Sequence, residues 1–275
     1  MEQKNQIFKD GSKTFYYASR FFPAGKRQDV ATLYAFVRLP DNYVDRIPQL
    51  PDEFYSFRKL YEQSASAVTG NKVIDDFRAL QLRKHFKQAW IEAYLDAMER
   101  DLSENVIRTE TDMLDYVHGS AEVVGLMMSR ILDLPENLDE YAIKLGRAYQ
   151  LINFIRDVDE DITFGRTYFP EEDLKKFGIY PLTKESIYRH QQEFSDMMRF
   201  QIQRFRTWHT EAMSGVSAMP YRYRVPVLTA SAQYLWTASV IDRDPMTVME
   251  QKVKPSRWQV ISGGLAASIT QLLRR

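Results

Sequence analysis

The segment Gly146-Arg-Ala-Tyr-Gln-Leu-Ile-Asn-Phe-Ile-Arg-Asp-Val-Asp-Glu-Asp161 predicts most about how this chain folds. It contains no proline, and its apolar residues return every three or four positions, as on a helix that packs against a core. Gln150, Asn153, Asp157 and Asp161 recur at the same spacing, so they share one face of that helix. The segment therefore predicts a helix with a line of amides and carboxylates set among apolar residues.

Helical periodicity continues over the rest of the 275 residues, which include only 11 glycines and 11 prolines. This pattern predicts an all-α fold. Because no internal repeat or linker interrupts it, we expect a single-domain helix bundle over residues 1–275. The predicted helices are Asp29–Arg46, Asp52–Thr69, Val73–Asp101, Glu110–Leu132, Leu138–Asp161, Lys184–Met213, Val225–Ile241 and Arg257–Leu273.

Composition excludes several classes of function. The 37 basic and 37 acidic residues balance, so no net field attracts nucleic acid or an anionic membrane. The chain has no cysteine, which excludes disulfides, thiolate nucleophiles and cysteine-bound metals. Without a signal-like start or a run long enough to span a bilayer, we expect a cytoplasmic protein. A peripheral membrane contact that releases product is the alternative. The amphipathic segment Trp258–Leu273 could make such a contact, but we favour its interpretation as a terminal helix docked on the bundle.

A second acidic stripe precedes the first in the chain. Tyr34, Arg38, Asp41 and Asp45 follow one another at spacings of four, three and four, so they share a helix face. Pro40 lacks an N–H group and should bend or open that helix just before the first aspartate. Arg38 lies one turn from the acids, where it could meet a phosphate. The stripe thus repeats the aspartate spacing of the first segment.

Paired acids one turn apart repel each other unless a cation lies between them. Carboxylate and amide oxygens suit Mg²⁺, with Mn²⁺ as the alternative ion, and Mg²⁺ usually keeps waters and substrate phosphates as further ligands. Taken singly, each stripe could equally be a solvated helix end. Two stripes on facing helices favour a metal and diphosphate site. The histidines lack zinc-site spacing and are interpreted as structural or surface residues: His85, His118, His190 and His209.

These motifs resemble those of the phytoene, squalene and dehydrosqualene synthases. Tyr149–Asp161, followed by Gly165–Pro170, is similar to the second aspartate-rich motif of that family, and Tyr34–Asp45 is similar to the first. The resemblance extends from about Phe8 to Trp258. Further similar segments, in the family's order, are Ser12–Phe15, Tyr116–Gly125, Pro226–Leu228 with Tyr234, and Lys252–Trp258.

The resemblance implies an all-α isoprenoid synthase bundle around a central cavity, in which Mg²⁺ bridges aspartates to substrate diphosphates. Its implied catalytic residues are Tyr34, Arg38, Asp41, Asp45, Asp157 and Asp161. Its implied metal ligands are Asp41, Asp45, Asn153, Asp157 and Asp161. Substrate-binding residues are expected at Lys13, Phe15, Tyr116, Ala121, Val124, Gly125, Gln150, Asn153, Arg156, Arg166, Tyr168, Tyr234 and Lys252. For Ala121, Val124 and Gly125, close helix packing is an equally good reading.

Four positions depart from the family's pattern. Asn42 stands where many members have a second adjacent aspartate, and Glu122 stands where glycine is frequent. Asp159 replaces a usual glycine, and we expect it to add to the acidic cluster. Lys252 replaces a usual arginine, which keeps the charge and loses bidentate binding.

The implied reaction is a head-to-head condensation of two prenyl diphosphates through a cyclopropylcarbinyl diphosphate. Two geranylgeranyl diphosphates giving phytoene is the first expectation. Squalene or dehydrosqualene from farnesyl diphosphate is the second, and squalene would require NADPH. A head-to-tail elongase or terpene cyclase is disfavoured because its Asp-Asp-x-x-Asp pattern is absent. A catalytically silent homologue that acts as an assembly factor is the non-enzymatic alternative. The sequence leaves tail length and oligomeric state open.

Overall fold

The computed structural model describes residues 2–103, 106–256 and 258–260, with residues 2, 3, 5, 13 and 14 entering only through their backbone. Within these ranges every regular element is helical, which confirms the predicted fold class. The α-helices are α1 (Glu2–Gly11), α2 (Lys13–Ser19), α3 (Ala24–Val44), α4 (Pro51–Gln63), α5 (Lys72–Lys84), α6 (Gln88–Arg100), α7 (Glu110–Val117), α8 (Val123–Ile131), α9 (Asp139–Thr163), α10 (Glu171–Lys176), α11 (Lys184–Arg189), α12 (Gln191–Met213), α13 (Tyr221–Arg243) and α14 (Thr247–Glu250). Shorter segments are the π-helix η1 (His118–Glu122) and the 3₁₀ helices η2 (Glu136–Leu138) and η3 (Ser214–Ala218).

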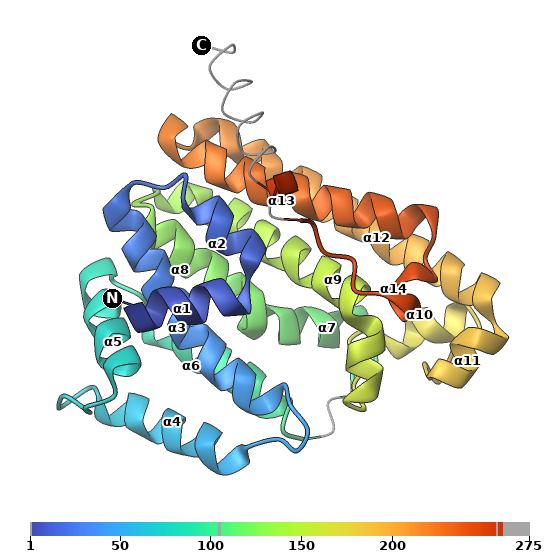
Figure 1. The fold of residues 1–275 in the computed structure, drawn as a ribbon, viewed down its shortest axis with the longest axis horizontal. Coiled ribbons are helices and arrows are strands. Elements are labelled where there is room, and N and C mark those ends of the chain that lie inside the picture. The colour runs from blue at the N-terminus through green and yellow to red at the C-terminus, as the bar shows by residue number, and fades with distance from the viewer. Residues whose placement is uncertain (1, 104–105, 257, 261–275) are drawn as a thin grey trace.

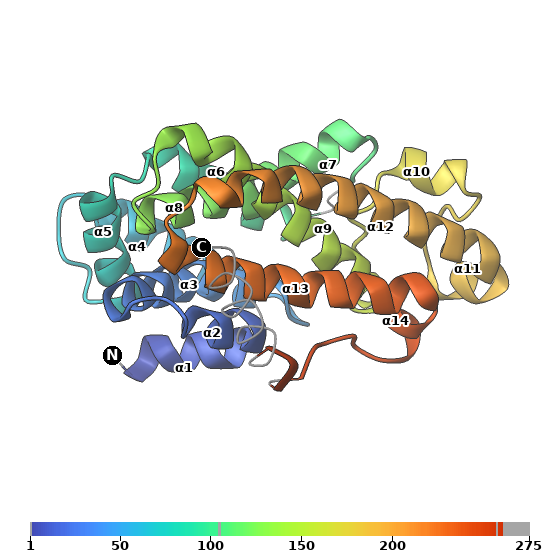
Figure 2. The same ribbon diagram turned by 90° about the horizontal axis from the view of Figure 1, so that it is seen from above.

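Helix α9 is the centre of the bundle. It packs most extensively against α12 and also contacts α8, η1, α13 and α14. Helices α12 and α13 run side by side along one edge of the molecule, whereas α10 and α11 form one end (Figures 1 and 2). On the other side, α1 lies over α3, and α2 packs against both α1 and α13. The N-terminal helices therefore cover the space between α3 and α13.

Close approach of the central helices depends on two glycines. A Cβ atom on Gly146 of α9 would lie 2.6 Å from the backbone oxygen of Ala121, and one on Gly125 of α8 would lie 2.4 Å from that of Ala142. Real Cβ atoms do not come so near a carbonyl oxygen, so only glycine allows α9 to touch η1 and α8 here. The packing interpretation of Gly125 is therefore correct, whether or not it also contacts substrate.

Three predicted helix boundaries were wrong. Val73–Asp101 is not one helix, because His85 adopts a left-handed conformation (φ 55°) that ends α5 before α6 begins. Lys184–Met213 is interrupted at His190, whose φ of −125° lies outside the helical range. Asp52–Thr69 ends early, at Gln63. Short helices α1, α2, α10 and α14 were not expected, and most of the predicted helix Arg257–Leu273 lies outside the described residues.

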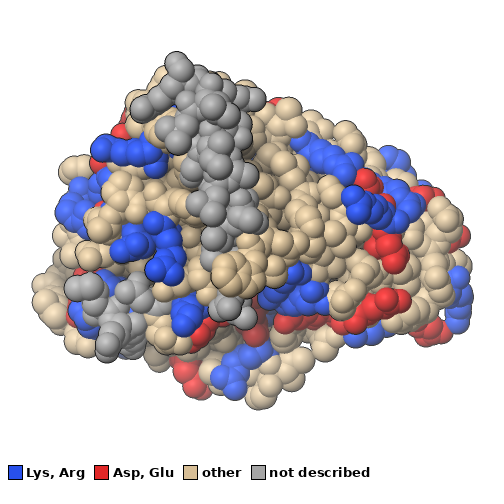
Figure 3. Space-filling model, turned by 45° about the horizontal axis from the view of Figure 1, so that its top comes forward, with Lys and Arg blue, Asp and Glu red and all other residues tan. Residues whose placement is uncertain are grey.

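Surface charge is mixed on the face shown in Figure 3, which carries both basic and acidic side chains among uncharged ones. This distribution matches the balanced composition of the chain. None of the described helices combines the length and the apolarity that crossing a bilayer requires.

Candidate active site

A cavity of about 480 Å³ lies inside the bundle. Helices α2, α3, α8, α9 and α13 contribute to its lining, together with η1 and η3. Most of the lining is apolar, with Phe22, Leu33, Val124, Met128 and Val216 as representative side chains. A cavity of this kind suits a long hydrocarbon chain.

Both predicted acid pairs line this one cavity. Asp41 lies in the last turn of α3 and Asp45 caps its C-terminus, while Asp157 and Asp161 lie in the last two turns of α9. Carboxylates near helix C-termini oppose the helix dipole, so the arrangement favours a bound cation. Two segments separated by more than a hundred residues are thus brought to the same end of the cavity.

Basic side chains accompany the acids. Arg38 forms an ion pair with Asp41, and both line the cavity. Arg156 Nη2 lies 2.5 Å from Asp157 Oδ2, and Lys252 Nζ lies 3.3 Å from Asp157 Oδ1. Each of these cations could instead bind a phosphate group once a ligand enters. The acidic end therefore holds partners for anions as well as for a metal ion.

Arg166 ties the end of α3 to the loop that follows α9. Its Nη1 lies 2.6 Å from Asp45 Oδ1, while its Nη2 donates to the backbone oxygens of Val44, at 2.5 Å, and Asp101, at 3.1 Å. Arg166 is buried and lies beside the cavity rather than on its lining. These contacts make it a residue that positions Asp45.

Asp101 is a cavity-lining acid that the sequence did not single out. It is 4% exposed and accepts hydrogen bonds from the hydroxyls of Tyr116, at 2.7 Å, and Tyr168, at 3.1 Å. Burial raises the pKa of Asp101 to about 6, although Arg166 and the two tyrosines oppose this rise. It has no helical spacing to the other acids, so no sequence signal pointed to it.

The acids differ in how their surroundings favour ionisation. Burial, together with the negative charge of Asp45, raises the pKa of Asp41 to about 7. Burial and the charge of Asp157 raise the pKa of Asp161 well above its usual range. Burial also acts on Asp157, but Arg156 and Lys252 together outweigh it and lower the pKa of this carboxyl. A cation bound at this end would lower the cost of ionising Asp41 and Asp161.

The donor set fits a hard divalent ion that also binds ligand oxygens. The Oδ1 atom of Asn153 is buried and has no hydrogen-bond partner among the described residues, and its side chain lines the cavity. No three acids or histidines in the described ranges lie close enough to hold a metal ion by themselves. An ion here would therefore take one or two carboxylates and complete its shell with water or phosphate, as Mg²⁺ usually does.

The structure places most of the other predicted site residues on the lining as well. Those that line the cavity are Phe15, Tyr34, Tyr116, Ala121, Val124, Gly125, Gln150, Asn153, Arg156 and Tyr168. Tyr234 lies just behind it, with its ring centroid 4.4 Å from that of Tyr149 and 5.8 Å from that of Phe15. Lys252 lies outside the lining, where it pairs with Asp157 and Glu160, and the side chain of Lys13 is not described. Their roles stay predictions.

Three of the unusual residues turn away from the cavity. Glu122 is buried behind the lining, where Arg147 Nε donates to its Oε1 at 2.6 Å. Asp159 does not join the acidic cluster as predicted, because it points outward and pairs with Lys184 at 2.6 Å. Asn42 is exposed. These departures therefore leave the lining itself unchanged.

Fold and cavity together define an all-α bundle with a mostly apolar internal cavity that carries acidic and basic side chains at one end. The family model for squalene/phytoene synthase matches residues 8–259, so the chain belongs to that family.

Individual relatives agree with this assignment. The chain is 30% identical over 274 residues to a phytoene synthase of Arthrospira platensis, with 92% of this chain and 87% of the relative covered. It is 29% identical over 184 residues to a 4,4'-diapophytoene synthase of Staphylococcus haemolyticus, with 64% of each covered. A crystal structure of a dehydrosqualene synthase superposes with a TM-score of 0.84 at 23% identity, over 100% of this chain and 96% of that one. This last likeness concerns the fold alone.

Proposed function

We propose that this chain condenses two geranylgeranyl diphosphates head to head, through a cyclopropylcarbinyl diphosphate, to give phytoene. The observation that carries the proposal is that both acid pairs, with Arg38 and Arg156, line one end of a cavity that is otherwise mostly apolar. Membership of the squalene/phytoene synthase family supports the reaction type, and the phytoene synthase relative supports the product.

The first step breaks an allylic carbon–oxygen bond and leaves a diphosphate anion and a prenyl cation. Arg38 and Arg156 are placed to bind the departing anion, because both line the acidic end. The rings of Phe15 and Tyr34 line the same cavity and can stabilise the cation, by roughly 1 kcal/mol or more where water is excluded. The apolar lining keeps water from quenching the cation.

The cation is then attacked by the double bond of the second prenyl diphosphate, and loss of a proton closes the cyclopropane ring. Ionisation of that ring's diphosphate opens it to the head-to-head product, and loss of a further proton completes the central double bond. Both ionisations release a diphosphate, so both can use the same basic side chains. One cavity with a single polar end can therefore serve both ionisation steps of the reaction.

Asp41, Asp45, Asn153, Asp157 and Asp161 would hold metal ions, each ion taking one or two of the carboxylates, with Mg²⁺ as the first choice and Mn²⁺ as the alternative. Support comes from the partnerless Oδ1 of Asn153 and from the raised pKa values of Asp41 and Asp161. When bound, the ion supplies positive charge that neutralises the leaving diphosphate.

The test is incubation of the purified chain with geranylgeranyl or farnesyl diphosphate and Mg²⁺, followed by identification of the extracted hydrocarbon. We expect phytoene from the longer substrate, and no product after EDTA treatment or in Asp157→Ala. Asp159→Ala is the matched control, because Asp159 lies on the same helix and points outward. Full turnover in Asp157→Ala or in EDTA would contradict the metal site.

A second candidate is the condensation of two farnesyl diphosphates, which the diapophytoene synthase relative favours. Parallel incubations with and without NADPH separate dehydrosqualene from squalene. If a folded wild-type chain forms no hydrocarbon from either substrate, the assembly-factor alternative replaces both proposals.

A further inference from the structure

The end of the cavity away from the acids is formed by the turn between α8 and α9. Leu132 and Leu134 of this turn line the cavity, as does Leu138, which immediately precedes α9. Asp157 lies nineteen positions after Leu138, which at 1.5 Å for each residue is about 28 Å along the helix. The turn is thus the far wall of the cavity as seen from the metal-binding end.

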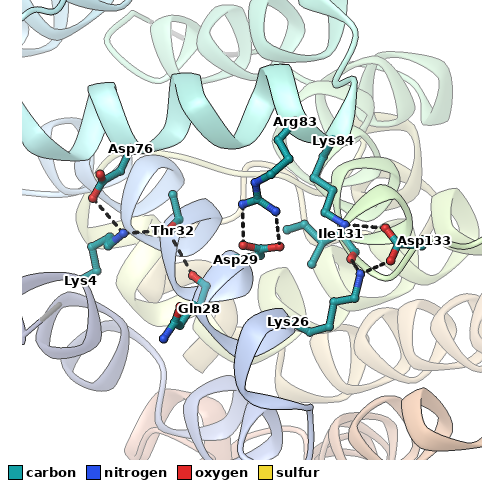
Figure 4. Close-up of polar contacts among 10 residues, drawn as sticks. All are labelled: Lys4, Lys26, Gln28, Asp29, Thr32, Asp76, Arg83, Lys84, Ile131 and Asp133. Carbon is teal, nitrogen blue, oxygen red and sulfur yellow. Dashed lines mark hydrogen bonds and ion pairs between the residues drawn. The ribbon is translucent and has the colours of Figure 1, made fainter.

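Two lysines hold this turn from outside (Figure 4). Lys26, in the first turn of α3, donates to the backbone oxygen of Ile131 at 2.5 Å and to the carboxylate of Asp133. Lys84, in the last turn of α5, donates to the other carboxylate oxygen of Asp133 at 2.5 Å. We call Lys26, Lys84 and Asp133 the lysine clamp. It joins α3 and α5 to the turn that closes the cavity.

The clamp acts on a backbone conformation that is unfavourable by itself. Asp133 has a φ of 53°, in the left-handed region, which costs a residue other than glycine roughly 1 kcal/mol. The lysine side chains are only 15% and 11% exposed, so they are ordered by the surrounding protein, whereas Asp133 is 63% exposed. Because Leu132 and Leu134 flank Asp133, its anchoring also fixes the positions of these two lining side chains.

The length of the cavity distinguishes the two candidate substrates. An extended chain advances about 1.2 Å for each bond, since three backbone bonds of a peptide span roughly 3.3–3.6 Å. The sixteen-carbon main chain of a geranylgeranyl group is therefore roughly 18 Å long, and the twelve-carbon main chain of a farnesyl group roughly 13 Å. The diphosphate, which lies between the first carbon and the acids, and the side chains of the wall take up the remaining roughly 10 Å of the about 28 Å, so the longer tail reaches the Leu132–Leu134 wall and the shorter one stops roughly 5 Å before it.

We propose that the lysine clamp fixes the far wall of the cavity against the last isoprene unit of a geranylgeranyl tail, and so determines the preference of this chain for tail length. The inference rests on the proposed function, since it takes a prenyl diphosphate as the ligand. Lys26, Lys84 and Asp133 are positioning residues, because they do not line the cavity and act through Leu132 and Leu134.

The test compares the wild type with Lys26→Met/Lys84→Met and with Asp133→Gly. The second variant removes both lysine–carboxylate contacts but keeps the bond from Lys26 to the oxygen of Ile131, and glycine preserves the left-handed turn. Arg83→Met is the matched control. It removes the neighbouring pair with Asp29, at 2.7 Å, and leaves the turn untouched (Figure 4). For each variant, kcat/KM is measured with geranylgeranyl and with farnesyl diphosphate, and Kd is measured with the unreactive thiolodiphosphates of both tails.

We expect the preference for the longer tail to fall roughly tenfold in both clamp variants, the effect of about one small apolar group in a specificity pocket. The kcat/KM and Kd for the farnesyl compounds should stay near those of the wild type in every variant, and Arg83→Met should also resemble the wild type with the longer tail. Lys26→Arg should keep most of the wild-type preference, because arginine retains the positive charge and the hydrogen-bond donors. If the double variant does not fold, Asp133→Gly decides.

An unchanged ratio in a folded clamp variant, or the same shift in Arg83→Met, would overturn the inference. Equal losses with both tails would also overturn it, because they indicate a general loss of structure. A wild type that turns over neither substrate would refute the proposed function instead, and the ratio of the two Kd values would still decide whether the clamp sets tail length.

Discussion

Replacement of Asp101 by asparagine tests whether burial raises the pKa of this cavity-lining carboxyl. Burial raises the pKa of Asp101 to about 6 in the folded chain, against 3.8 for the exposed group. The folded state therefore binds the proton more tightly than the unfolded state does. The stability that this proton contributes is fully present below a pH of about 3.8 and is lost as the pH rises through about 6.

The magnitude follows from the difference in pKa. A shift of about 2 pKa units corresponds to about 3 kcal/mol, of which about 2 kcal/mol is lost between about pH 4.5 and pH 7. Asparagine stays neutral at every pH, so Asp101→Asn lacks this loss. We expect the free energy of unfolding of the variant, minus that of the wild type, to rise by about 2 kcal/mol over this range.

Urea unfolding followed by circular dichroism, in EDTA and at several pH values, measures this difference directly. Taking the difference cancels the titration of distant acids that both chains share. Loss of the Asp101 charge also lowers the pKa of Asp41, which adds to the expected rise. Asp112→Asn is the matched control. Hydrogen bonds from the backbone of Thr109 and Arg108 lower the pKa of Asp112, so its difference should stay nearly flat above about pH 4.5 and change only as the pH falls below about 3.8. A flat difference for Asp101→Asn, or one that falls with rising pH, would refute the reasoning, since the tyrosines and Arg166 would then outweigh burial.

Other expected outcomes concern packing and a buried histidine. Gly146→Ala should lower the free energy of unfolding by at least roughly 1–3 kcal/mol in urea titrations, because its Cβ would lie 2.6 Å from the oxygen of Ala121. Glu122→Ala should lower it by roughly 1–3 kcal/mol in the same assay, since Arg147 loses its buried acceptor. Burial lowers the pKa of His209 to about 4, so the wild type should lose stability as the pH falls from about 6.5, and His209→Leu should lose less, as thermal unfolding at each pH would show.

Both acidic stripes could be predicted because helical spacing is a local property of the sequence. Residues three and four apart share a face wherever the helix packs, so Asp41 with Asp45, and Asp157 with Asp161, needed no tertiary information. We could also predict that the two stripes face one cavity. This followed from the family resemblance and from the fact that helix bundles often form metal sites between facing helices. The outward position of Asp159 was also accessible, because a residue two positions after Asp157 lies about 200° further around the helix.

Other features depended on contacts between distant segments. Asp101 ends a helix with no acid in register with it, and only the folded chain brings Tyr116 and Tyr168 to its carboxylate. The helix breaks at His85 and His190 carry no glycine or proline, so the sequence offered no stop signal there. Asp133 likewise gave no sign that it anchors the far wall of the cavity.

The most direct measurement is the ratio of released diphosphate to hydrocarbon in a single reaction mixture of this chain, Mg²⁺ and geranylgeranyl diphosphate. If one cavity with two acid pairs carries out both ionisations, two diphosphates should appear for each phytoene formed, and Asp41→Asn and Asp157→Asn should each abolish both products. Diphosphate accompanied by geranylgeraniol without phytoene, or full phytoene formation in either variant, would contradict the account.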